Sequence, residues 1–145
     1  MHSHVRAAGG SWLKAHRAFL IEDALFSKLE GALSPHEEKK TVHQIRRAEI
    51  ICNGLDFGVI AAVYAISAAG GIPVSSCNGG CFASRHSEPF PVIAFHWPSE
   101  RLPLMRQCAK VAGVSMWVHR HGELVIGADY IRRFLLFADA LLQRQ

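Results

Sequence analysis

The chain has 145 residues, of which 50% are hydrophobic and 19% are charged, and this composition excludes an intrinsically disordered chain. Its formal charge of +4 is mild, and its lysines and arginines form no long basic run, so nucleic acid is allowed as a partner but is not favoured. We expect one domain over residues 1–145 that buries a core, with 1–10 as a loosely held N-terminal tail.

Two features of the sequence, its cysteines and its longest uncharged stretch, indicate where in the cell the protein is expected. Four cysteines without a signal-peptide pattern do not resemble a secreted disulfide framework, so we expect a cytoplasmic protein. No charged residue occurs from Phe57 to Ser84, and that length could cross a membrane. Gly70, Gly71 and Pro73 interrupt it, however, and the helical part that remains, about thirteen residues, is too short for a bilayer. We therefore expect no membrane partner.

The first half of the chain predicts three helices. Apolar residues recur at helical spacing over 11–31, which is typical of a long amphipathic helix. Ser34 caps a second helix over 34–50, where a proline and two glutamates follow it in the first turn. Asp56 is expected to cap a third helix over 57–69. Because this segment is apolar nearly all round, we expect it to be buried on more than one side.

The second half predicts strands and two more helices. Short β-type runs occupy 72–77 and 90–95, and a helix over 99–113 ends at a glycine. A hairpin is expected over 114–126, followed by a last helix that Asp129 caps. The sum of about five helices and four strands predicts a two-layer α/β (α+β) domain, with a small mixed or antiparallel sheet covered by helices.

The loop between the strands at 72–77 and 90–95 concentrates reactive groups. Its Asn78-Gly79-Gly80 turn can expose backbone amides to an anion or another ligand. Polar groups at the carboxyl end of a strand resemble the usual place for ligand sites in open α/β sheets. The expected ligand-binding residues are Ser76, Asn78, Gly79, Gly80, Arg85 and His96.

One hypothesis for this loop is a zinc site. Cys77, Cys81 and His86 supply the thiolate and imidazole ligands that zinc prefers, and Glu88 or His96 could complete the set. Structural zinc sites generally use two ligand pairs, whereas this stretch has a single Cys-x3-Cys pair. The alternative is that both cysteines are small packing residues.

A second hypothesis makes Cys77 a nucleophile in a transferase or hydrolase. His86 or His96 would serve as its base and Glu88 would complete the catalytic set. A catalytic thiol needs a lowered pKa, which a neighbouring cation such as Arg85 could provide. The competing explanation is again a thiol that only fills space.

A third hypothesis is a non-catalytic interaction module, or an immunity-like protein, in which the loop is structural. Trp12, Trp97 or Trp117 would then offer a contact surface to a protein partner. The amphipathic helix over 11–31 could instead pair with a copy of itself in a homodimer. The sequence therefore leaves a small molecule and a protein open as partners.

One local resemblance concerns the same region. The run Val74-Ser75-Ser76-Cys77-Asn78-Gly79 follows an apolar helix and a glycine turn and precedes the strand-like 91–95. This arrangement resembles the Ser-Ser-Cys-x-Gly region of the wybutosine-synthesising tRNA methyltransferase family, and small uncharacterised bacterial proteins share the pattern. The resemblance covers about residues 55–97 and implies a shared helix, turn and strand arrangement. That family carries arginine directly after the motif glycine, where this chain has Gly80.

Overall fold

The structure, a computed structural model, describes residues 2–3, 11–31, 33–83, 88–119 and 121–145. Its α-helices are α1 (Trp12–Glu30), α2 (Pro35–Ile51), α3 (Ile60–Ala68), α4 (Leu102–Ala112) and α5 (Arg133–Gln143). Its strands are β1 (His2–Ser3), β2 (Ile72–Cys77), β3 (Val92–His96), β4 (Ser115–Val118) and β5 (Leu124–Gly127). Two short 3-10 helices, η1 (Cys81–Ala83) and η2 (Ser99–Arg101), complete the described elements.

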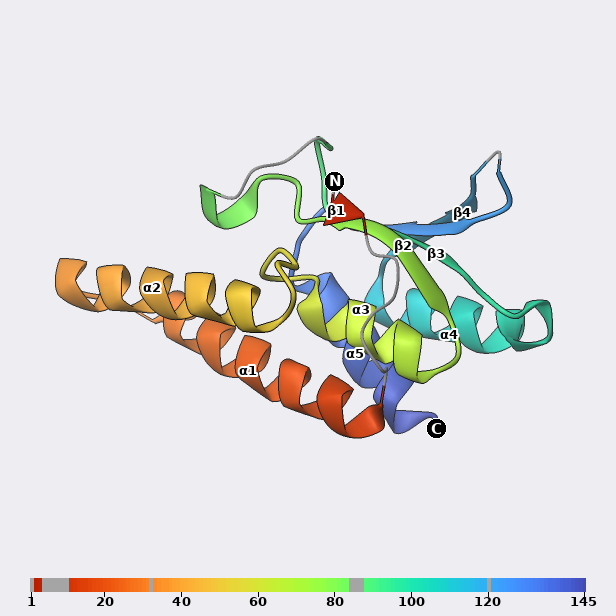
Figure 1. Ribbon diagram of the computed structural model, residues 1–145, viewed down its shortest axis with the longest axis horizontal. Helices are drawn as coiled ribbons and strands as arrows, with labels where there is room; N and C mark the ends of the chain where they lie inside the picture. Colours follow the sequence, from red (N-terminus) through yellow and green to blue (C-terminus); the bar gives the residue numbers. More distant parts are fainter. Residues whose placement is uncertain (1, 4–10, 32, 84–87, 120) are drawn as a thin grey trace.

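The strands form one antiparallel sheet in the order β1-β2-β3-β5-β4, and the α-helices lie on one side of it (Figure 1). Side chains alternate along β3 and β5 as the period of a strand requires. Ile93 and Phe95 pack into the main core, whereas Val92 and Ala94 form a separate cluster with Val125. We call the face of the sheet that carries Ile93 and Phe95 the inner face, and the face that carries Val92 and Ala94 the outer face. The predicted two-layer α/β fold is confirmed.

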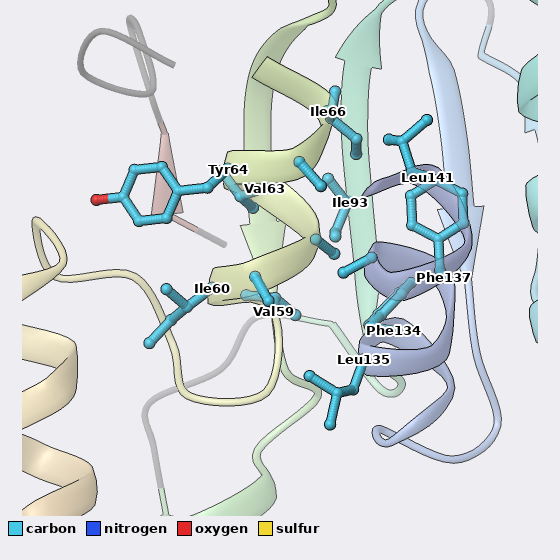
Figure 2. Packing of buried hydrophobic residues seen from close by; sticks show 14 of the residues in the cluster. Val59, Ile60, Val63, Tyr64, Ile66, Ile93, Phe134, Leu135, Phe137 and Leu141 are labelled. Atoms are coloured by element: carbon cyan, nitrogen blue, oxygen red, sulfur yellow. The ribbon is translucent and has the colours of Figure 1, made fainter. Parts of the chain in front are cut away.

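The core lies between α3, α5 and the inner face of the sheet. Every residue from Ile60 to Ile66 in α3 is buried, which confirms that this apolar segment is enclosed on several sides. Ile66 of α3, Ile93 of β3 and Leu141 of α5 come together in this space (Figure 2). Within the described ranges no helix combines the length and the apolar character that crossing a bilayer requires.

The local signals for helix ends are confirmed at two places. The Ser34 hydroxyl accepts a hydrogen bond from the Glu37 amide at 3.2 Å, and the Glu37 carboxylate accepts one from the Ser34 amide at 3.4 Å. This reciprocal pair satisfies two amides at the start of α2. Gly113 ends α4 at φ 71°, a left-handed conformation that favours glycine.

Two expected caps are wrong. Asp56 does not cap α3, whose N-cap position is Val59, because its carboxylate instead accepts a hydrogen bond from the amide of Asn78 at 3.1 Å. Asp129 does not cap α5; its carboxylate pairs with Arg133, 2.9 Å away.

The structure describes two residues of the expected N-terminal tail. His2 and Ser3 pair with Ser76 and Ser75 as strand β1, so this part of the tail extends the sheet. Residues 4–10 of the expected tail lie outside the described residues.

A buried carboxylate replaces the missing cap of α3. Glu22 of α1 is only 1% exposed, and its carboxylate accepts hydrogen bonds from the amides of Gly58 at 2.6 Å, Ile60 at 3.2 Å and Ala61 at 2.8 Å. Ile60 and Ala61 belong to the first turn of α3, whose amides have no partners inside the helix, and Gly58 lies just before the N-cap residue Val59. The positive end of the helix dipole also favours a negative group there. Glu22 therefore joins α1 to α3.

Candidate functional site

The turn after β2 is a buried corner built around Asn78. The Asn78 side-chain amide donates hydrogen bonds to the carbonyls of Phe57 at 3.1 Å and Cys81 at 3.0 Å. Its side-chain oxygen accepts from the Gly80 amide at 3.1 Å, while the sulfur of Cys77 accepts from the Gly79 amide at 3.3 Å. The two glycine amides that were expected to hold an anion thus have partners inside the turn.

The two cysteines of the corner differ in exposure. Cys77 is 0% exposed, whereas Cys81 is half-buried. Burial raises the pKa of the Cys81 thiol, and the nearby Cys77 adds to the shift. A nucleophilic cysteine needs an accessible thiol with a lowered pKa. The geometry of the corner therefore favours thiols that pack and hydrogen-bond over a thiol that attacks a substrate.

We expect cysteine labelling in the native state to follow this exposure. Cys81 should react first with iodoacetamide, and Cys77, Cys52 and Cys108 should stay protected because all three are buried. The raised pKa of Cys81 means that its labelling should become fast only at alkaline pH. Mass spectrometry after timed quenching measures each site. Fast labelling of Cys77 below pH 7 would contradict this account and would restore the nucleophile hypothesis.

Among the other expected site residues that the structure describes, His96 lies far from the corner. The β2–β3 register pairs Cys77 with Val92 and Ile72 with His96, so His96 lies at the far end of the strand pair, about 13 Å along a strand that rises about 3.3 Å per residue. His96 is therefore too distant to act as a base or ligand beside Cys77. Ser76 is fully buried in β2.

The structure describes only two of the three expected zinc ligands, Cys77 and Cys81. Arg85 and His86 lie outside the described residues, so the structure does not place the third expected ligand. In the part of the chain that is described, no three His, Cys, Asp or Glu side chains gather closely enough to hold a metal ion.

A cavity of about 320 Å³ lies on the outer face of the sheet, and Glu88 is among its lining residues. We call it the outer-face pocket. Val92, Ala94 and Val125 form its buried apolar floor. The remaining lining residues are Val74, Ser75, Glu88, Phe90, Trp117, His119 and Glu123.

Two aromatic rings form a wall of the outer-face pocket. Phe90 and Trp117 meet edge to face with their ring centroids 6.4 Å apart. They lie against Gly127, where a Cβ atom would come within 2.9 Å of the indole ring and 3.2 Å of the phenyl ring. The glycine of β5 thus leaves room for both rings on the sheet. Trp117 remains 39% exposed, so part of the indole faces solvent.

Two of the four polar side chains that line the outer-face pocket are carboxylates. Glu88 and Glu123 bring two carboxylates, and the imidazole of His119 lies 3.5 Å from the Glu123 carboxylate. His121 follows, with its ring centroid 5.5 Å from that of His119. The described lining therefore carries two acidic groups in a chain whose formal charge is +4.

Only part of the outer-face pocket could be predicted from the sequence. Glu88 belongs to the expected site, and Trp117 is one of the tryptophans with an expected contact role. His119 and Glu123 were missed. The alternation of Ser115, Trp117 and His119 along the hairpin is a signal that could have placed His119 on the same face as Trp117.

Comparisons of the chain with protein-family models, with curated proteins and with solved structures find no match. The resemblance of residues 55–97 to the wybutosine-synthesising family stays a prediction.

Proposed function

We propose that this protein is a binding module whose ligand is an organic cation with an apolar body, held in the outer-face pocket. The observation that carries the proposal is the pairing of an aromatic wall with two carboxylates over a buried apolar floor. A pocket of roughly 300–1,000 Å³ with a few convergent polar groups is typical of small-molecule sites. The 320 Å³ of this pocket suits a small ligand.

Each part of the pocket has a role in this proposal. The exposed part of the Trp117 indole can attract a cation through its ring face. Glu88 and Glu123 can accept charge-assisted hydrogen bonds from an ammonium group. The floor of Val92, Ala94 and Val125 supports an apolar body that leaves water.

The end of the β2–β3 loop that precedes β3 contributes to the proposed binding site. Glu88 and Phe90 belong to the segment that leads into β3 and reach the outer-face pocket. The Asn78 corner anchors the near end of the same loop. We therefore assign the corner a structural role and the outer-face pocket the binding role, without a catalytic step at Cys77.

A matched series of ligands tests the proposal: 2-phenylethylamine, 2-phenylethanol and phenylacetate share one ring and differ in charge. We expect the amine to bind at least about five times more tightly than the anion at pH 7 and low salt, because the acidic lining favours a cation. The preference should shrink as salt is added. Isothermal titration calorimetry measures the three affinities.

Variants locate the source of the preference. Glu88→Gln and Glu123→Gln should each weaken binding of the amine severalfold and leave 2-phenylethanol nearly unchanged. Glu100→Gln removes an exposed carboxylate from η2, outside the pocket lining, and serves as the matched control. Equal affinity for all three ligands, or an amine affinity that neither pocket variant lowers, would contradict the proposal.

A further inference from the structure

A second cavity of about 460 Å³ lies where the loop after β2 meets the end of α1. We call it the loop groove. Its lining residues are Phe26, Leu29, Glu30, Cys81, Phe82, Pro91, Asp129, Tyr130 and Ile131. None of them lines the outer-face pocket. The two cavities are therefore distinct in composition.

The Phe82 side chain is part of a fixed aromatic cluster in this groove. Its ring meets Phe57 with centroids 4.9 Å apart and Phe26 with centroids 5.9 Å apart, both edge to face. Phe26 and Phe57 are buried, so they hold the Phe82 ring against the core. Tyr130 adds a further, mostly exposed ring to the groove.

The backbone of Phe82 adopts an unfavourable conformation. Its φ of 59° lies in the left-handed region, which residues with a side chain rarely adopt. The Arg46 guanidinium donates a hydrogen bond to the Phe82 carbonyl and also pairs with Glu49 at 2.8 Å. Such conformations persist only where the surroundings impose them, and they concentrate at ligand sites. The left-handed conformation of Phe82 places its phenyl ring in the wall of the groove.

The charges at the groove are neutralised within the chain. The Glu30 carboxylate pairs with Arg132, and the Asp129 carboxylate pairs with Arg133 at 2.9 Å. Cys81 adds a half-buried sulfur, which is polarisable and suits contact with an aromatic ring. The groove thus offers rings, aliphatic groups and sulfur, and both of its carboxylates are paired with arginines.

From these observations we infer that the loop groove is a second binding site, specific for an uncharged aromatic molecule. The ligand would lie among Phe26, Phe82 and Tyr130, with Leu29 and Cys81 along its edge. Aromatic pairs favour edge-to-face contacts, and the rings of the cluster are already in such contacts with one another. This inference does not depend on the function proposed for the outer-face pocket.

Protection of Cys81 gives a direct test, with indole as the uncharged probe. At alkaline pH, where the Cys81 thiol reacts, we expect indole to slow its alkylation by iodoacetamide at least about fivefold. Indole-3-acetate should protect it much less, because moving its carboxylate out of water is costly without a charged partner and the described lining of the groove offers no cation that lacks a carboxylate partner. NMR shifts of the Cys81 and Tyr130 amides on adding indole at pH 7 give a second readout that does not depend on thiol reactivity.

Variants separate the groove from the rest of the molecule. Leu29→Arg fills the groove and Tyr130→Ala removes an exposed ring, so both should reduce protection by indole. Leu13→Arg, at an exposed site on the same helix, and Trp117→Ala, in the outer-face pocket, should leave protection intact. Circular dichroism checks that each variant folds. Alkylation and amide shifts that indole does not change, or protection that survives Leu29→Arg and Tyr130→Ala but is lost in Trp117→Ala, would overturn the inference.

Discussion

Replacing Glu22 by alanine should lower the free energy of unfolding by about 4 kcal/mol, the range in which a broken buried polar network lies. The change removes the carboxylate that accepts hydrogen bonds from the amides of Gly58, Ile60 and Ala61. Because Glu22 is only 1% exposed, water cannot easily replace the lost oxygen atoms. Urea unfolding followed by circular dichroism measures the loss.

Two further variants make this test specific. Glu22→Gln keeps one side-chain oxygen at the start of α3, so its loss should be smaller than that of Glu22→Ala. Asp23→Ala changes a neighbouring, more exposed carboxylate on the same helix and should cost less than about 1 kcal/mol, as exposed ion pairs generally do. A free energy of unfolding for Glu22→Ala that lies within about 1 kcal/mol of the wild-type value would contradict the role of Glu22 as a cap.

The same carboxylate predicts a pH dependence. Burial raises the pKa of Glu22 from 4.5 to about 7, against the opposing effect of its three backbone hydrogen bonds. The folded state therefore binds more protons than the unfolded state between pH 4.5 and about 7. Its contribution to stability is fully present below pH 4.5 and declines as the pH rises through that window, by on the order of 3 kcal/mol. The stability of Glu22→Gln should lack this decline.

Replacing Asn78 by alanine should cost about 3 kcal/mol, because the carbonyls of Phe57 and Cys81 would lose their side-chain donor and the Gly80 amide its acceptor. Asn78→Asp keeps the size of the side chain but turns its donor atoms into acceptors, so a similar loss is expected. Cys77→Ala in the same turn should cost less, about 1 kcal/mol, as a small core truncation. Urea unfolding measures the loss in each of the three variants. If Asn78→Ala lost the least unfolding free energy of the three, the structural role of Asn78 would be contradicted.

The fold could be predicted from the sequence where the signals are local. The uncharged segment of α3 predicts its own burial, the Ser34 capping box begins α2, and Gly113 ends α4. Each of these depends on residues within a few positions of one another. The caps of α3 and α5 could not be predicted in this way, because Asp56 and Asp129 bind other partners in the folded chain.

The candidate site was harder to predict for a related reason. Glu88 lies before β3, while His119 and Glu123 lie at the hairpin of β4 and β5. They come together only because β5 pairs with β3 and places β4 at the edge of the sheet, and no local pattern specifies that order. The sequence instead drew attention to Cys77, whose surroundings prove to be buried and hydrogen-bonded.

The most direct measurement of the central claim is an NMR titration of the isotope-labelled protein with 2-phenylethylamine at pH 7. We expect the largest shifts at the Trp117 indole and at the amides of Val125 and Gly127, and weaker shifts at the same places with 2-phenylethanol and phenylacetate. Shifts that miss these three residues, or that are equal for the amine and phenylacetate, would contradict a cation site on the outer face of the sheet.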